Sequence, residues 1–221
     1  MSIDLPVTLT VRGTPIVAGD KIRTLHNETA GSPQGIAAAR SLGDLSHKVF
    51  APLAGDARPD ELLFIDVWIE AAGIQKFFAH PDVVAQGAQL FKHKDPTVWM
   101  PARGAYTFSL PAPRDKSERY VGLLRGPIGS PEEALALFAA NDRKIVAEGR
   151  KRGQLSHELF IKLGPPGAPL ELLGIDVWCD RAGMDAHYAE VGSHMAELAK
   201  AFTGAPSAST WQAAPGQWSE W

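Results

Sequence analysis

In residues 155–163 of the second half of the chain, every second side chain falls on one side, namely Leu155, His157, Leu159, Ile161 and Leu163, and residues 172–179 read as a partner strand. Alternation with a period of two is typical of half-buried strands, and the turn residues 164–167 between them predict a hairpin. From residue 184 to residue 202, apolar positions recur at spacings of three and four, which predicts an amphipathic helix packed on a sheet.

Two further signals precede this hairpin. Residues 120–124 read as a strand, and Ser130, Pro131 and Glu133 predict the start of a helix. Serine caps the first turn, proline suits the first helical position and glutamate suits the third. With a last short strand around Trp211, the predicted order is βαββαβ, which is the ferredoxin-like split motif.

The first half of the chain shows the same order with two breaks. A helix that starts near Gly19 is interrupted at Gly31-Ser32-Pro33, because proline removes a helical hydrogen bond. His26, Asn27 and Glu28 lie at this break, where we expect a solvated loop, with a lid over one cavity as the alternative. The other predicted elements are strands 7–11, 45–53 and 62–69, a helix 72–91 kinked at His80-Pro81, and a short strand around Trp99.

The two halves are copies of one unit. Residues 45–74 and 155–184 align without a gap at an offset of 110, with 15 identical pairs in 30. We expect a first ferredoxin-like repeat in residues 1–101, a linker in 102–118, a second repeat in 119–216 and a tail in 217–221 that packs back on the surface.

The repeat also predicts the architecture. A ferredoxin-like sheet carries helices on one face and leaves the other bare, so two copies are expected to cover each other. The predicted fold class is therefore α+β, with two ferredoxin-like βαββαβ repeats that form an intramolecular dimeric α+β barrel.

The strand over residues 62–70 has two different faces. One is wholly aliphatic and suits the helices, so we expect the mixed face to line the barrel interior as a small-molecule cavity. The aliphatic face holds Leu63, Ile65, Val67 and Ile69, and the mixed face holds Phe64, Asp66 and Trp68.

Composition narrows the class of partner. The chain has 22 Lys+Arg and 25 Asp+Glu, a net charge of −3, so neither nucleic acid nor an anionic membrane is an expected partner. The single Cys179 excludes an intramolecular disulfide. Residues 1–11 lack a secretory pattern, and no segment reaches the roughly 18–20 apolar residues of a membrane helix, so a cytoplasmic location is expected.

Residues 175–178, 183–188 and His194 resemble the dimeric α+β barrel superfamily, in particular its antibiotic biosynthesis monooxygenase-like domains. Known relatives include cofactor-free oxygenases acting on quinols or polyketide aromatics, haem-degrading enzymes and isomerases, so the fold does not fix the reaction. In that family two chains usually pair. The resemblance therefore implies an internal pseudo-dimer, and it leaves further homodimerisation open.

The family's helix histidine corresponds to His187, with Trp178 on the preceding strand. In the first repeat the same position is Phe77, and the nearest histidine is His80. Haem-degrading relatives also use an asparagine on the first strand, which neither repeat offers. No cofactor is therefore expected, with haem held by His187 or His194 as the alternative, and no metal site is expected because these two histidines lie roughly 10 Å apart along a helix.

His47 and His157 each share a hairpin with an aspartate, Asp66 and Asp176 respectively. If the register makes them cross-strand neighbours, each carboxylate can orient a neutral imidazole as a general base. If the register differs by one residue, each histidine faces the aliphatic side and has a structural role. The sequence leaves both possibilities open.

Three functions are compatible with these features. The first is a cofactor-independent monooxygenase-like enzyme in which His187, or the pair His157 and Asp176, removes a proton from a small aromatic or polyketide-like ligand. The second is a non-catalytic small-molecule-binding or stress-responsive protein, and the third is a haem-binding protein. The substrate, and which half holds the pocket, stay open. The expected ligand-binding residues are Trp178, Trp68, Asp66, His47, Tyr188, His80 and His194.

Overall fold

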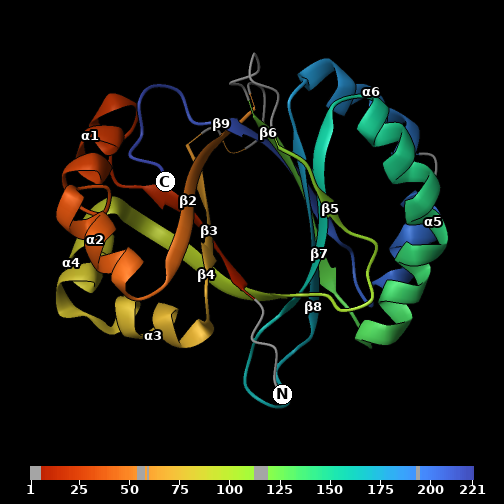
Figure 1. Ribbon diagram of the computed structural model, residues 1–221, viewed down its shortest axis with the longest axis horizontal. Helices are drawn as coiled ribbons and strands as arrows, with labels where there is room; N and C mark the ends of the chain where they lie inside the picture. Colours follow the sequence, from red (N-terminus) through yellow and green to blue (C-terminus); the bar gives the residue numbers. More distant parts are fainter. Residues whose placement is uncertain (1–5, 54–57, 59, 112–118, 193–194) are drawn as a thin grey trace. The chain divides into compact units, whose positions relative to one another are not determined.

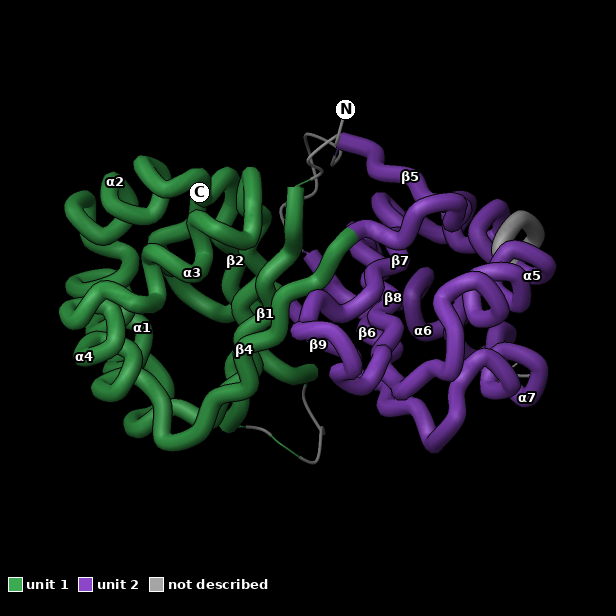
Figure 2. Tube along the Cα trace, turned by 90° about the horizontal axis from the view of Figure 1, so that it is seen from below, with its two compact units in different colours: residues 1–100, 213–221 green, residues 101–212 purple. Residues whose placement is uncertain are grey.

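The computed structural model describes residues 6–53, 58, 60–111, 119–192 and 195–221. The chain forms two compact units, residues 1–100 with 213–221 (unit 1) and residues 101–212 (unit 2), coloured separately in Figure 2. In each unit an antiparallel sheet carries helices on one face (Figure 1). No helix among the described residues is both long enough and apolar enough to cross a membrane.

Unit 1 has the strand order β4-β1-β3-β2, with all neighbours antiparallel. The predicted helix breaks are confirmed, because Pro33 and Pro81 each begin a new helix. Ser32 Oγ accepts a hydrogen bond from the Gly35 N–H (3.1 Å) and caps the first of these. The elements are β1 (Val7–Pro15), α1 (Asp20–Glu28), α2 (Pro33–Ser41), β2 (Asp44–Pro52), β3 (Leu62–Trp68), α3 (Ala71–Ala79), α4 (Pro81–Leu90) and β4 (Phe91–Pro101).

Unit 2 has the order β9-β6-β8-β7-β5, again antiparallel. The predicted cap is present, since Ser130 Oγ accepts a hydrogen bond from the Glu133 N–H at 3.2 Å. The elements are β5 (Phe108–Ser109), β6 (Tyr120–Pro127), α5 (Pro131–Lys151), β7 (Gln154–Lys162), β8 (Glu171–Trp178), α6 (Arg181–Val191), α7 (Met195–Leu198), a 3₁₀ turn (Ala199–Ala201) and β9 (Ser207–Ala213).

Both hairpins have the register that places histidine opposite aspartate. His47 pairs with Asp66 across β2 and β3, and His157 pairs with Asp176 across β7 and β8. Each hairpin also has a β-bulge just before its histidine. The bulge lies between Asp44 and Ser46 in unit 1 and between Gln154 and Ser156 in unit 2. The first of the two registers left open by the sequence is the one observed.

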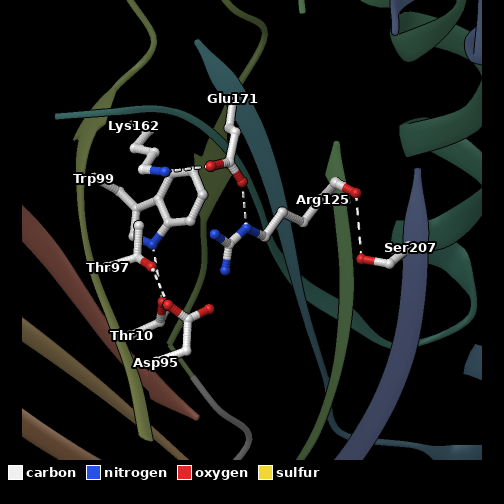
Figure 3. Close-up of polar contacts among 8 residues, drawn as sticks. All are labelled: Thr10, Asp95, Thr97, Trp99, Arg125, Lys162, Glu171 and Ser207. Carbon is white, nitrogen blue, oxygen red and sulfur yellow. Dashed lines mark hydrogen bonds and ion pairs between the residues drawn. The ribbon is translucent and has the colours of Figure 1, made fainter. Parts of the chain in front are cut away.

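Polar contacts at the other end of the strands repeat as well. In unit 2, Glu171 accepts hydrogen bonds from Arg125 Nε (2.6 Å) and from Lys162 Nζ (Figure 3). In unit 1, Arg12 Nε donates to Glu61 at 2.6 Å. Also in unit 1, buried Trp99 donates its indole N–H to Thr10 Oγ1 at 2.8 Å (Figure 3). The ion pairs of Glu171 in unit 2 and of Glu61 in unit 1 are partly buried, and they fix the ends of the strands in each repeat.

The prediction of which sheet face meets the helices is wrong. In unit 1 the mixed face of β3 packs on the helices, where Trp68 contacts Phe77 with ring centroids 5.5 Å apart. In unit 2, Trp178 likewise contacts His187 of α6 at 4.9 Å. Two apolar faces cannot be told apart by hydrophobicity alone, and large aromatic rings fill the space between a sheet and its helices.

Candidate functional site

Unit 1 contains a cavity of about 430 Å³ between its sheet and its helices. This volume lies within the range of small-molecule sites. Phe64, Asp66 and Trp68, the mixed face that was expected to line a cavity, do line it. The cavity nevertheless lies on the helix side of the sheet and not on the side that was expected. Its apolar walls come from β1, β3, β4 and α2–α4, and they include Leu9, Val11, Ala39, Phe64, Ile74, Phe77, Phe78, Leu90 and Phe91.

Ionisable side chains line one end of the cavity, which is called its ionisable end below. His47 Nδ1 lies 2.7 Å from Asp66 Oδ1, and both side chains are more than nine-tenths buried. Burial disfavours a charged His47, but the Asp66 charge and hydrogen bond, with Asp44 and Glu220, outweigh it and raise the pKa of His47. The raised pKa favours the imidazolium form of His47 beside the Asp66 carboxyl group.

A second histidine extends this pair. His26 Nε2 lies 3.1 Å from His47 Nε2, and the two rings stack. Burial, together with the neighbouring His47 charge, lowers the pKa of His26 to about 4, so this ring is neutral at pH 7. The expectation of a solvated loop at His26 is wrong, because α1 continues to Glu28 and the His26 side chain is only 1% exposed.

Asp44 supplies a carboxyl group with an unusual pKa. It is buried at the start of β2, lines the cavity, and accepts a hydrogen bond from the Ser46 N–H at 3.2 Å. Burial and then the Asp66 charge raise the pKa of Asp44 to about 7. The bulge in β2 follows this residue directly, and bulges often redirect side chains beside functional sites. Both protonation states of Asp44 are therefore populated near neutral pH.

Two buried N–H groups beside the cavity, on the indole rings of Trp68 and Trp221, have no partner among the described residues. Trp68 is 1% exposed, and its indole N–H donates no hydrogen bond. Asp66 uses Oδ1 for His47, and no described residue donates to its Oδ2. Both residues line the cavity. A buried N–H donor without a partner is costly unless a ligand or water satisfies it.

The same two positions in unit 2 are satisfied by a tyrosine. The Tyr188 hydroxyl accepts from Trp178 Nε1 (3.3 Å) and donates to Asp176 Oδ2 (3.0 Å). The glycine at position 122 makes room for it, because a Cβ there would lie 1.8 Å from the hydroxyl oxygen. Burial raises the pKa of Tyr188 well above its usual range, so it stays a neutral phenol.

Unit 2 also lacks the carboxyl group of Asp44. Gln154 takes that register position, opposite Trp178, and donates to Asp176 Oδ1 at 2.8 Å. His157 Nδ1 lies 2.7 Å from the same oxygen. His187 is buried beside Trp178 and Tyr188, and burial lowers its pKa. The structure thus brings His157, Asp176, Trp178, His187 and Tyr188 together around an internal phenol.

The remaining candidates lie elsewhere. His80 is exposed at the junction of α3 and α4, where its Nδ1 accepts a hydrogen bond from the Asp82 N–H and caps α4. His194 lies outside the described residues. Trp68, Asp66 and His47 all line the unit 1 cavity.

Sequence reasoning gave no site role to Asp44 or to Trp221, which also lines the cavity, and named His26 only through the alternative of a lid over one cavity. Asp44 could have been found, because the offset of 110 pairs it with a neutral glutamine and so marks a charge present in one repeat only. His26 follows Ile22 by four residues, a spacing that places both on the buried side of one helix. Nothing in the local sequence marks Trp221.

The cavity does not fit a haem iron. An axial histidine needs a ring nitrogen with a lone pair directed at the metal. Both histidines that line the cavity, His26 and His47, use both ring nitrogens in side-chain contacts of 3.1 Å or less. The described residues also contain no group of three or more His, Cys, Asp or Glu placed to hold a metal ion.

No protein-family model and no curated protein matches the sequence of the chain. Solved structures do match its fold over nearly the whole length. An anthrone oxidase-like protein matches with a TM-score of 0.66 at 13% identity, covering 96% of this chain and 92% of the other. A candidate monooxygenase from Fusobacterium nucleatum subsp. nucleatum matches with a TM-score of 0.63 at 11% identity, covering 96% and 93%. Chlorite dismutase from Candidatus Nitrospira defluvii matches with a TM-score of 0.58 at 10% identity, covering 97% and 93%.

These similarities define the class of fold. The chain shares its α+β fold with these structures, and the predicted fold class of two ferredoxin-like repeats is confirmed. The first neighbour is named as anthrone oxidase-like and the second as a monooxygenase, but identities this low establish the fold and leave the reaction to be argued from the site.

Proposed function

We propose that unit 1 binds a flat, largely apolar phenolic molecule and removes a proton from it, so that the resulting anion reacts directly with dioxygen. The observation that carries this proposal is the ionisable end of an otherwise apolar cavity, formed by Asp44, Asp66, His47 and His26. The name of one fold neighbour, an anthrone oxidase-like protein, agrees with this class of substrate.

Asp44 is the proposed proton acceptor. Its carboxyl group lines the cavity, and a pKa of about 7 matches a general base that works near neutral pH. His47 is a poor candidate, since one ring nitrogen faces Asp66 and the other faces His26. The His47–Asp66 pair instead provides fixed charges beside the acceptor.

The reaction balances without a cofactor. A CH₂ group between aromatic rings gives one proton to Asp44, and the carbanion transfers electrons to dioxygen as a C–O bond forms. Asp44 returns its proton to the resulting peroxide anion, and loss of water from this hydroperoxide leaves a carbonyl group, so that CH₂ and O₂ become C=O and H₂O. The charge of the anion forms in a cavity with apolar walls, where interactions with fixed charges and dipoles are strong.

Trp68 and Asp66 are the proposed binding site for a hydroxyl group of the ligand. The hydroxyl of Tyr188 bridges the equivalent tryptophan and aspartate in unit 2. In unit 2, Gly122 makes room for that hydroxyl and pairs with Asp176 across the sheet. The residue that pairs with Asp66 in unit 1 is Leu9, so a leucine stands where unit 2 has the glycine. A ligand hydroxyl must therefore approach the Trp68–Asp66 pair from the cavity side.

The test uses 1,8-dihydroxyanthrone and the purified chain, with oxygen uptake and quinone absorbance measured against spontaneous oxidation. We expect binding and a rate above the blank. Trp68→Phe should weaken binding about three- to tenfold, the loss of one hydrogen bond, whereas the matched Trp178→Phe in unit 2 should leave binding unchanged.

Equal effects of the two tryptophan variants would contradict a ligand site in unit 1. Binding without turnover would instead establish the non-catalytic ligand-binding function. Catalysis by His187, His157 and Asp176 stays a prediction, which His187→Ala and His157→Ala test in the same assay.

A further inference from the structure

The segment 217–221 packs on the ionisable end of the site within unit 1. Its last residue exchanges backbone hydrogen bonds with β2, because the His47 N–H donates to Trp221 O (2.8 Å) and the Trp221 N–H donates to His47 O (3.3 Å). The Trp221 ring stacks on His47 with centroids 4.6 Å apart. Glu220 accepts from the Val49 N–H at 2.8 Å. This segment, which Figure 2 colours with unit 1, is called the strap below.

The strap fixes the orientation of one amide side chain. Asn27 Oδ1 accepts a hydrogen bond from the Ser219 N–H (2.9 Å), and Asn27 Nδ2 donates to Gln217 O (2.9 Å). A backbone N–H can only donate and a backbone carbonyl can only accept. The oxygen and nitrogen of the Asn27 amide are therefore assigned by the strap.

The assigned amide dictates where the protons of the two histidines lie. Asn27 Oδ1 is an acceptor 3.1 Å from His26 Nδ1, so this nitrogen must carry the proton. A neutral His26 then has a lone pair on Nε2, which accepts from a proton on His47 Nε2 at 3.1 Å. With Nε2 protonated, His47 meets the Asp66 carboxylate through Nδ1.

We propose that Asn27 and the strap are positioning elements, which hold His26 as its Nδ1–H tautomer and thereby keep His47 protonated on Nε2, with its charge fixed beside Asp66. The charged and titratable groups that face His47 are Asp66 on β3, Asp44 on its own strand, His26 on α1 and Glu220 on the strap. With His47 held in one form, Asp44 is the group left to exchange a proton with the ligand. This catalytic consequence depends on the function proposed above, whereas the tautomer assignment does not.

The test is ¹⁵N NMR of the histidine ring nitrogens in the full chain at pH 7. We expect a single Nδ1–H tautomer for His26, above about 90%, because one neutral form satisfies every contact. Asn27→Leu removes the acceptor at similar size and should convert His26 to a mixture of tautomers. Asn27→Asp keeps an acceptor and should retain the Nδ1–H form. Asn141→Leu, a partly buried asparagine of α5 that donates to Leu137 O, is the matched control.

Removal of residues 217–221 provides a second and independent route to the same change. The shortened chain should lose the single His26 tautomer, and its turnover of 1,8-dihydroxyanthrone should show an altered pH profile. An unchanged Nδ1–H tautomer in Asn27→Leu would overturn the proposal. If the wild-type tautomer is as expected and oxidation is absent, the positioning role stands and the proposed function fails.

Discussion

Asp44→Asn is expected to reduce turnover of the aromatic substrate by about 10²- to 10⁴-fold, the usual contribution of a general base. Asparagine has nearly the same size and keeps an oxygen for the Ser46 N–H, so the cavity should still bind its ligand. It also resembles Gln154, the neutral residue at this position in unit 2. The measurement is kcat with the ligand dissociation constant determined separately.

The same substitution should increase stability at high pH. An unfolded aspartate has a pKa near 3.8, whereas burial raises the pKa of Asp44 to about 7 in the folded chain. The folded state therefore binds the proton more tightly, and wild-type stability falls as pH rises from about 4 to about 7. The full difference corresponds to at most about 4 kcal/mol, and we expect a gain of about 2 kcal/mol for Asp44→Asn at pH 8.

The gain in stability from Asp44→Asn should shrink below pH 4, where Asp44 is protonated in both the folded and the unfolded state. His26 changes stability in the opposite direction, because its lowered pKa makes the fold less stable as pH falls from 6.5 to about 4. His26 is present in both proteins and cancels in the difference. Asp20→Asn, an exposed aspartate paired with Arg23, is the control. Unchanged kcat in Asp44→Asn would show that another group accepts the proton.

Local patterns in the sequence predict much of this fold. The cap at Ser130, the proline breaks at Pro33 and Pro81 and the alternating strands each depend on residues a few positions apart. The repeat adds the fold class, because two units with the same order share one topology. The histidine–aspartate register could be narrowed to two choices, and the structure selects the one with cross-strand pairs.

The site was less predictable because its contacts join distant parts of the chain. His26 meets His47 from a different element, and Trp221 reaches His47 across more than half the sequence. Such pairs have no signature in a short window. The sheet face was assigned wrongly for a related reason, since Asp66 looks unsuited to a helix-covered surface until its partner His47 is known.

Asp66→Ala should have the largest effect on stability, a loss of about 3–5 kcal/mol in denaturant unfolding. The substitution leaves the His47 imidazolium buried without its carboxylate. Because the pKa of His47 is raised in the folded chain, the stabilisation it receives is complete below pH 6.5 and is lost as pH rises through the raised value. The cost of Asp66→Ala should therefore be larger at pH 6 than at strongly alkaline pH.

Two comparisons distinguish this pair from simple packing. Asp176→Ala in unit 2 removes the acceptor of His157, Gln154 and Tyr188, so it should also destabilise the chain but leave ligand binding intact. The double variant Asp66→Leu with His47→Phe replaces both charges by apolar groups and should recover most of the lost stability, because a buried pair contributes little beyond an apolar substitute. It should not recover turnover, since the charges beside Asp44 are absent. A loss below about 1 kcal/mol for Asp66→Ala would mean that His47 is neutral in the folded chain, which contradicts the fixed charge pair.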